Sequence, residues 1–207
     1  MKIHMMTGGI ASTNAYFISN AGQSVLIDAP EGAADWVSSL LEDPSLRLHS
    51  LILTHGHFDH TWDAAVLRKK NQCEVLYHPA DAILIETPEI QAEYGFPKVT
   101  PVKATRLLTE GNTLDFGPIH LRILHIPGHC PGNVALVWDA EKTVFVGDVI
   151  FAGSIGRTDL PGGSLSLLLE GIRDKLWRLP DDYRILSGHG PATTIGQEKK
   201  SNPYLKA

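Results

Sequence analysis

The sequence has few cysteines, no basic run and no long apolar run. Two cysteines, Cys73 and Cys130, are too few for a disulfide framework, so we expect a cytoplasmic protein in a reducing compartment. The net charge of -5, from 18 Lys+Arg against 23 Asp+Glu, argues against nucleic-acid binding. Residues 1–4 lack the apolar core of a signal peptide, and no segment approaches the length of a membrane span. We therefore expect neither a nucleic-acid nor a membrane partner.

The chain has 207 residues, of which 43% are hydrophobic, enough for a sizeable core. No internal repeat or linker divides it, so we expect one domain over residues 1–207. Short β-rich runs alternate with helical patterns in two similar halves. This pattern predicts an α/β fold with four αββα layers: two mixed sheets packed face to face, and helices on both outer faces. We predict strands at 2–7, 15–19, 24–28, 48–53, 74–77, 106–108, 119–126, 134–138, 143–146 and 183–186. The predicted helices cover 33–42, 63–70, 80–86 and 164–179, with a short helix near the end.

The most informative segment is THGHFDH, residues 54–60, which follows the apolar run 51–53. It places His55, His57, Asp59 and His60 within six positions. Neutral imidazole is the commonest protein ligand for transition metals, and a carboxylate completes a nitrogen–oxygen site. The strand before the segment delivers it to a sheet edge, where loops commonly build functional sites. We therefore interpret the segment as part of a metal site.

Three other strand ends carry potential metal ligands. His129 lies in the turn PGHCPG, Asp148 follows the apolar run 144–146 and a glycine, and His189 lies in SGHGP. Taken alone, such a histidine is more often a turn residue than a ligand, and such an aspartate is commonly a helix cap. The dense 54–60 cluster needs partners from elsewhere in the fold, and these three strand ends are the obvious suppliers. Cys130, beside His129, is interpreted as a small buried turn residue rather than a redox thiol.

In this order, and over essentially the whole chain, these motifs resemble the metallo-β-lactamase superfamily. The segment 153–163 and the ending Asn202-Pro203-Tyr204 resemble the short, single-domain glyoxalase II-like hydrolases, the hydroxyacylglutathione hydrolase subgroup. The resemblance implies an αββα sandwich with two metal ions at one edge. One ion is held by His55, His57 and His129 and the other by Asp59, His60 and His189, with Asp148 bridging them.

The resemblance also implies a reaction. Two cations can lower the pKa of a shared water from 15.7 to about 7, and the resulting hydroxide attacks a thioester carbonyl such as that of S-lactoylglutathione. Asp59 orients the hydroxide as well as binding metal. Two divalent ions are expected, zinc first, with iron and manganese compatible with the same nitrogen and oxygen ligands. The expected partner is a small-molecule thioester, glutathione thioesters included. The oligomeric state is left open.

The resemblance is weakest around the substrate. Larger glyoxalase II enzymes carry a C-terminal helical domain that binds glutathione, whereas only eighteen residues follow His189 here. Arg157 corresponds to a basic residue that contacts the glutathione carboxylate, but Asp159 stands where a tyrosine is expected. Both are candidate substrate contacts, and pairing with each other is an equally good explanation. Residues 87–100, with two prolines and few periodic apolar residues, are predicted to be an irregular excursion near the site.

Three alternatives stay open at this point. A persulfide dioxygenase would use His55, His129 and Asp148 on a single iron. A lactonase or other ester or amide hydrolase of the same superfamily would share the metal centre but not the substrate. A non-catalytic, metal-stabilised binding protein is the third, although purely structural sites tend to be closed and rich in thiolates.

Overall fold

The computed structural model describes residues 2–205 and contains two six-stranded sheets. The first sheet has the spatial order β1-β2-β3-β4-β5-β6, with antiparallel pairing among the first three strands and parallel pairing from β3 onwards. Because parallel strands end at the same sheet edge, β3 and β4 deliver their following loops to one place. The bounds are β1 Lys2–Gly8, β2 Thr13–Asn20, β3 Gln23–Ile27, β4 Ser50–Ile52, β5 Glu74–Tyr77 and β6 Arg106–Leu107.

The second sheet has the order β14-β13-β10-β9-β8-β7. Its pairs are antiparallel except β10 with β13, which run parallel and therefore also end at one edge. A separate two-stranded ribbon, β11 Ile150–Phe151 with β12 Ser154–Ile155, follows β10. The bounds are β7 Thr113–Phe116, β8 Ile119–His125, β9 Val134–Trp138, β10 Thr143–Gly147, β13 Arg184–Ser187 and β14 Thr193–Thr194.

The two sheets pack face to face, and the alternation of side chains along the strands explains how. In β2, Tyr16 and Ile18 point into the core between the sheets, whereas Ala15 and Phe17 point to the opposite face. Across the interface Tyr16 meets Phe145 of β10 edge-on, with ring centroids 5.3 Å apart. All five residues of β9 are buried, as expected for a strand covered on both faces.

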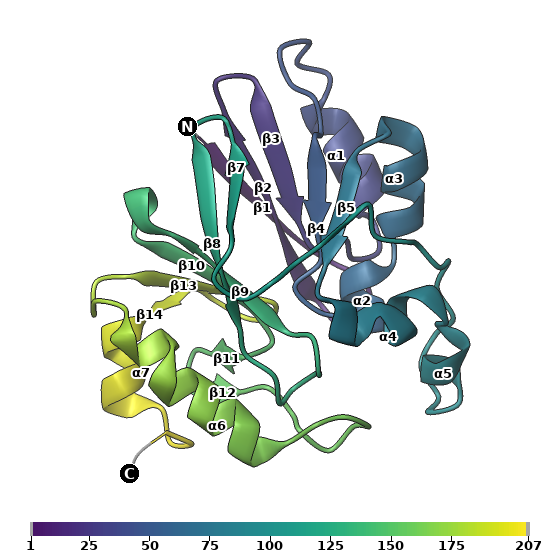
Figure 1. The fold of residues 1–207 in the computed structure, drawn as a ribbon. Coiled ribbons are helices and arrows are strands. Elements are labelled where there is room, and N and C mark those ends of the chain that lie inside the picture. The colour runs from purple at the N-terminus through teal and green to yellow at the C-terminus, as the bar shows by residue number, and fades with distance from the viewer. Residues whose placement is uncertain (1, 206–207) are drawn as a thin grey trace.

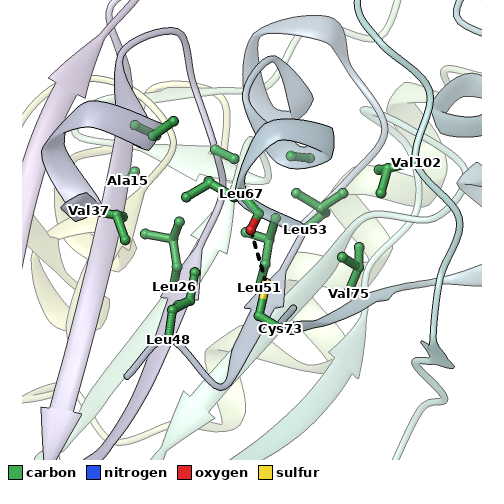
Figure 2. Packing of buried hydrophobic residues seen from close by; sticks show 14 of the residues in the cluster. Ala15, Leu26, Val37, Leu48, Leu51, Leu53, Leu67, Cys73, Val75 and Val102 are labelled. Atoms are coloured by element: carbon green, nitrogen blue, oxygen red, sulfur yellow. Dashed lines mark hydrogen bonds between the residues drawn. The ribbon is translucent and has the colours of Figure 1, made fainter. Parts of the chain in front are cut away.

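Helices cover both outer faces (Figure 1). On the first sheet, α1 Ala33–Leu40 and α3 Ala64–Asn71 bury Val37 and Leu67 against the strands, as Figure 2 shows. On the second sheet, α6 Leu165–Asp174 and α7 Ile195–Ser201 contribute Leu168 and Ile195 to a third buried cluster. The predicted four-layer αββα fold is therefore confirmed.

The remaining helical segments are short. They are α2 Phe58–Thr61, α4 Ala82–Glu86, α5 Glu89–Ala92 and the 3-10 helices Pro79–Asp81, Asp139–Glu141 and Leu176–Arg178. No helix of the described residues is both long and apolar enough to cross a membrane.

The structure corrects three details of the predicted elements. The helix predicted over 164–179 ends at Asp174, and a 3-10 turn continues the chain to the proline at 180. β7 was not predicted, although Thr113–Phe116 alternates exposed and buried residues as an edge strand should, and the short elements α2, β11, β12 and β14 were not predicted either. Residues 87–100 are largely irregular as predicted, but they include the short helix α5.

Candidate metal centre

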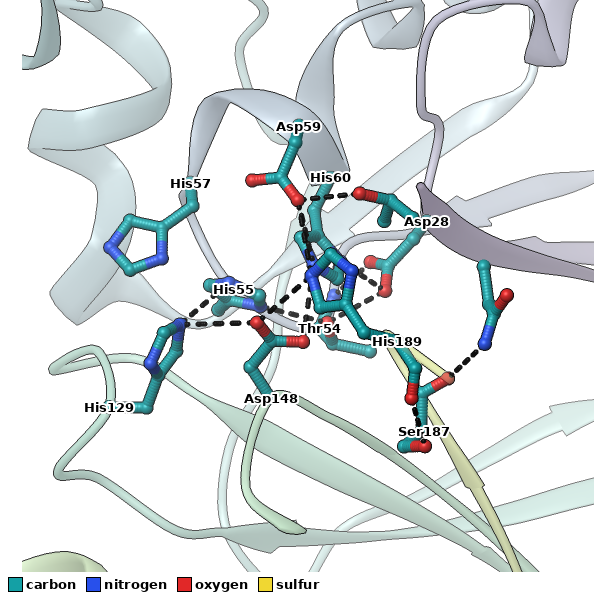
Figure 3. A network of polar contacts seen from close by, with 12 residues as sticks. Asp28, Thr54, His55, His57, Asp59, His60, His129, Asp148, Ser187 and His189 are labelled. Atoms are coloured by element: carbon teal, nitrogen blue, oxygen red, sulfur yellow. Dashed lines mark hydrogen bonds and ion pairs between the residues drawn. The ribbon is translucent and has the colours of Figure 1, made fainter. Parts of the chain in front are cut away.

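The candidate ligands come from five places in the chain and meet at one edge of the sandwich. His55 and His57 lie in the loop after β4, and Asp59 and His60 lie in α2. His129 lies between β8 and β9, Asp148 directly after β10, and His189 between β13 and β14. Figure 3 shows all seven side chains pointing toward a common centre. The structure therefore brings together every residue that the sequence marked as a metal ligand.

Three overlapping groups of three side chains each have ligand atoms within 4.8 Å of one another. The first is His55, His57 and His129, the second is Asp59, His60 and His189, and His55, His60 and Asp148 form a third that joins them. Asp148 lies between them. Its Oδ2 is 3.6 Å from His129 Nε2 in the first group and 3.2 Å from His189 Nε2 in the second, and its Oδ1 is 3.3 Å from His60 Nε2. The geometry is that of two adjacent sites sharing one carboxylate.

Buried polar atoms without partners test whether the arrangement suits metal ions. His60 Nε2 and Asp148 Oδ1 are both buried and lack a hydrogen bond among the described residues. Such atoms cost free energy unless something satisfies them. Both point into the centre, and imidazole nitrogen with carboxylate oxygen is a donor set that suits zinc, iron or manganese. The residues present therefore fit a pair of divalent cations.

The pKa values of the histidines show that the carboxylates of the centre attract positive charge. Burial lowers the pKa of His55, and it lowers that of His57 to about 3, with repulsion from His129 adding to it. Burial also opposes charge on His60, but Asp59, Asp28 and Asp148 raise its pKa well above the usual value. Burial lowers the pKa of His189, but hydrogen bonds to Asp148 and Asp59 outweigh burial and raise it to about 10. Without metal, imidazolium charge balances the carboxylates.

A buried carboxylate behind the second group fixes its geometry. Asp28, at the end of β3, accepts hydrogen bonds from Thr54 N at 2.7 Å and from Thr54 Oγ1 at 2.8 Å. It lies 2.8 Å from His60 Nδ1, so that nitrogen keeps its proton, and Nε2, which faces the centre, is the nitrogen that would lose its proton to bind metal. Thr13 Oγ1 similarly donates to Asp59 Oδ2 at 2.6 Å.

A second buried carboxylate joins the two loops of the first group. Asp81 accepts hydrogen bonds from Gly56 N at 2.8 Å and Gly132 N at 2.6 Å, and Cys130 Sγ lies 3.1 Å from both its oxygens. A side chain at position 132 would overlap this carboxylate, so glycine is required there. Burial and the neighbouring Asp81 carboxylate raise the pKa of the Cys130 thiol well above its usual value. The thiol is buried in a tight turn, and its proton is held by a carboxylate.

The sequence missed four supporting residues: Thr13, Asp28, Asp81 and Gln91. Asp28 had a usable signal, because it follows the apolar run 25–27 at a strand end, as Asp148 follows 144–146. Gln91 had none, since it lies in the irregular segment. Its side chain donates to Gly56 O at 2.9 Å and accepts from Phe58 N at 2.9 Å, which ties that segment to the ligand loop.

Arg157 and Asp159, the candidate substrate contacts, are paired with each other. Arg157 Nε and Nη2 each donate to Asp159 at 2.7 Å, and both side chains are exposed. The hydrogen bond from Arg157 lowers the pKa of Asp159 to about 2. Arg157 lines the cavity over the centre, and its backbone oxygen lies 2.8 Å from His129 Nδ1. This backbone contact orients the His129 ring.

Fold and donor set together define a class: an αββα sandwich built to hold metal ions at one edge. Comparison with known proteins gives the particular family. The metallo-beta-lactamase superfamily model matches residues 8–189, and the chain belongs to that superfamily.

Similar proteins share the full length of the chain. Hydroxyacylglutathione hydrolase GloC of Haemophilus influenzae is 37% identical, covering 100% of this chain and 99% of that protein. Among solved structures, BLEG-1 B3 metallo-beta-lactamase is 37% identical with a TM-score of 0.92, covering 100% of both chains. TTHA1623, solved in a di-iron-bound form, is 36% identical with a TM-score of 0.88, covering 98% of this chain and 100% of that one. These relatives support metal-dependent hydrolysis as the activity class.

Proposed function

We propose that this protein is a thioester hydrolase that works with two divalent metal ions, and that hydroxyacylglutathiones such as S-lactoylglutathione are the first substrates to test. The observation that carries the proposal is the position of Asp148 between two three-residue donor groups. A single-metal enzyme needs only one such group. The similarity to GloC supports the thioester substrate.

Each ligand has a role in this proposal. His55, His57 and His129 would hold one ion, Asp59, His60 and His189 would hold the other, and Asp148 would be shared between them. When bound, the ions lower the pKa of water from 15.7 to about 7 and supply positive charge near the scissile carbonyl. Zinc is the metal expected first, and the di-iron form of TTHA1623 supports iron as the alternative.

Asp59 is the residue proposed to orient the attacking water. Its side chain is 14% exposed and lines the cavity, and Thr13 Oγ1 holds its Oδ2 in place. The other oxygen of Asp59, Oδ1, is thereby left to accept a hydrogen bond from water, and its position is set by the place of Asp59 in α2. No serine or cysteine nucleophile is needed. Ser187, close in sequence to His189, donates to His189 O at 2.9 Å and so supports the turn.

The test is a substrate panel on purified, metal-loaded protein: S-lactoylglutathione, a lactone, a β-lactam and glutathione persulfide. Thiol release from the thioester at millimolar substrate, abolished by chelation and restored by zinc, is the expected result. Thioester inactivity with turnover of the lactone or β-lactam would reassign the substrate class. Oxygen uptake with the persulfide and one iron per chain would instead favour the single-iron dioxygenase, with His55, His129 and Asp148 as its ligands.

A further inference from the structure

An apolar pocket adjoins the candidate metal centre. His57, Gln91, Phe96 and Leu160 line both this pocket and the larger cavity over the centre, so the two spaces lie side by side. The pocket is the smaller, about 310 Å³ against about 640 Å³ including their open mouths. The other side chains that line it are Leu84, Ile90, Tyr94 and Pro161, which are apolar apart from the Tyr94 hydroxyl.

Polar groups in this pocket are already engaged. Gln91 is buried, and its amide donates to Gly56 O at 2.9 Å and Leu84 O at 3.1 Å while its oxygen accepts from Phe58 N. Of the other side chains that line the pocket, only those of His57 and the largely exposed Tyr94 can form a hydrogen bond. A hydroxyl placed there would lose its hydrogen bonds to water without replacement.

The larger cavity has a different character. It contains the carboxylates and imidazoles of the centre, together with Arg157, whose guanidinium is paired with Asp159. The size and polarity of the two spaces therefore indicate which half of a thioester each one would bind. The larger, polar space suits the thiol portion, and the narrow apolar pocket suits a short hydrocarbon chain on the carbonyl.

We infer that the site prefers an unsubstituted apolar acyl chain of a few carbons to the hydroxyacyl group of S-lactoylglutathione, the first thioester to test. This inference rests on the proposed thioesterase function and names its substrate class. Each methylene that enters the pocket should raise kcat/KM up to about fourfold, until the pocket is full. A hydroxyl beside the carbonyl should lower it at least about fivefold relative to the matched hydrocarbon.

The experiment compares glutathione thioesters that differ only in the acyl group: acetyl, propionyl, butyryl, hexanoyl and lactoyl. Each kcat/KM is divided by the rate of hydroxide-catalysed hydrolysis, which removes differences in intrinsic reactivity. The expected result is a rise of at least tenfold from acetyl to hexanoyl and a preference for propionyl over lactoyl. A flat series, or a preference for lactoyl, overturns the inference while leaving thioester hydrolysis intact.

A matched pair of variants locates the effect. Ile90→Asn, inside the pocket, should reduce the hexanoyl-to-acetyl ratio at least about fivefold. Ile83→Asn is the control, because Ile83 is 60% exposed on α4 and lines neither space. Equal ratios in the two variants and the wild type would overturn the assignment of this pocket.

A binding measurement separates this inference from the proposed function. Saturation-transfer NMR on the metal-free protein compares hexanamide with acetamide, and stronger transfer to hexanamide that Ile90→Asn abolishes is expected. If none of the thioesters is hydrolysed, the proposed function fails, and this NMR comparison alone then tests whether the pocket binds an apolar chain. Equal transfer to both amides would then overturn it.

Discussion

Asp28 offers the sharpest test of how the second ligand group is built. Its carboxylate accepts from Thr54 N, Thr54 Oγ1 and His60 Nδ1, at 2.7, 2.8 and 2.8 Å (Figure 3). In Asp28→Asn, the amide keeps one accepting oxygen and presents N–H donors in place of the other. With the oxygen still on Thr54 N, the new donor faces His60 Nδ1. The imidazole proton must then move to Nε2, the atom that points into the centre.

The size of the effect follows from this exchange of donor and acceptor. A ligand histidine in the wrong tautomer cannot bind metal, and loss of such a supporting partner commonly costs 10- to 100-fold in metal affinity. We therefore expect Asp28→Asn to bind one equivalent of zinc about 10- to 100-fold more weakly. The equivalent that the proposal assigns to His55, His57 and His129 should change much less.

The assay is competition between the protein and a fluorescent zinc chelator, fitted for two sites, with melting of the metal-free variant to show that it folds. Asp139→Asn is the control, since Asp139 is a carboxylate that accepts from Arg122 and Tyr183 far from the centre. Two sites of wild-type affinity in Asp28→Asn would refute the tautomer argument.

Three more predictions follow from the contacts around the centre. Asp81→Ala leaves the amides of Gly56 and Gly132 without their acceptor, which should lower the free energy of unfolding by about 2–4 kcal/mol in urea melts and weaken metal binding as well. Gly188→Ala places a Cβ against Asp148 Oδ1, and dialysed protein should retain less than the wild-type metal content, whereas full retention would contradict the packing. Zinc at 100 times its Kd should raise the Tm of metal-free protein by about 5–10 °C in calorimetry, and no shift would count against a binding site in the folded state.

The layers of the fold were predictable because their signals are local. Alternation and apolar runs mark most strands, including 134–138 and 143–146, which the structure confirms as β9 and β10. The missed strand β7 is a short edge strand whose partner is β8 alone, so little burial marks it in the sequence. The helix over 164–179 was predicted too long because its apolar residues continue through the 3-10 turn.

The site was partly predictable for a similar reason. The candidate ligands stand in short motifs at strand ends, where glycines and imidazoles are visible in the sequence. Their supports are not visible in this way. Asp81 reaches Gly132 across 51 positions and Gln91 reaches Gly56 across 35, and only the folded chain brings these atoms into contact. Likewise, the pairing of Arg157 with Asp159 decides whether either is free for substrate, and spacing alone left both explanations open.

The most direct test of the central proposal is a metal titration of metal-free protein, with bound metal measured by elemental analysis and thioester hydrolysis measured on the same samples. Hydrolysis should be absent without metal and should reach its maximum at two ions per chain. Full activity at one ion per chain, or hydrolysis by the metal-free protein, would contradict a two-metal thioesterase.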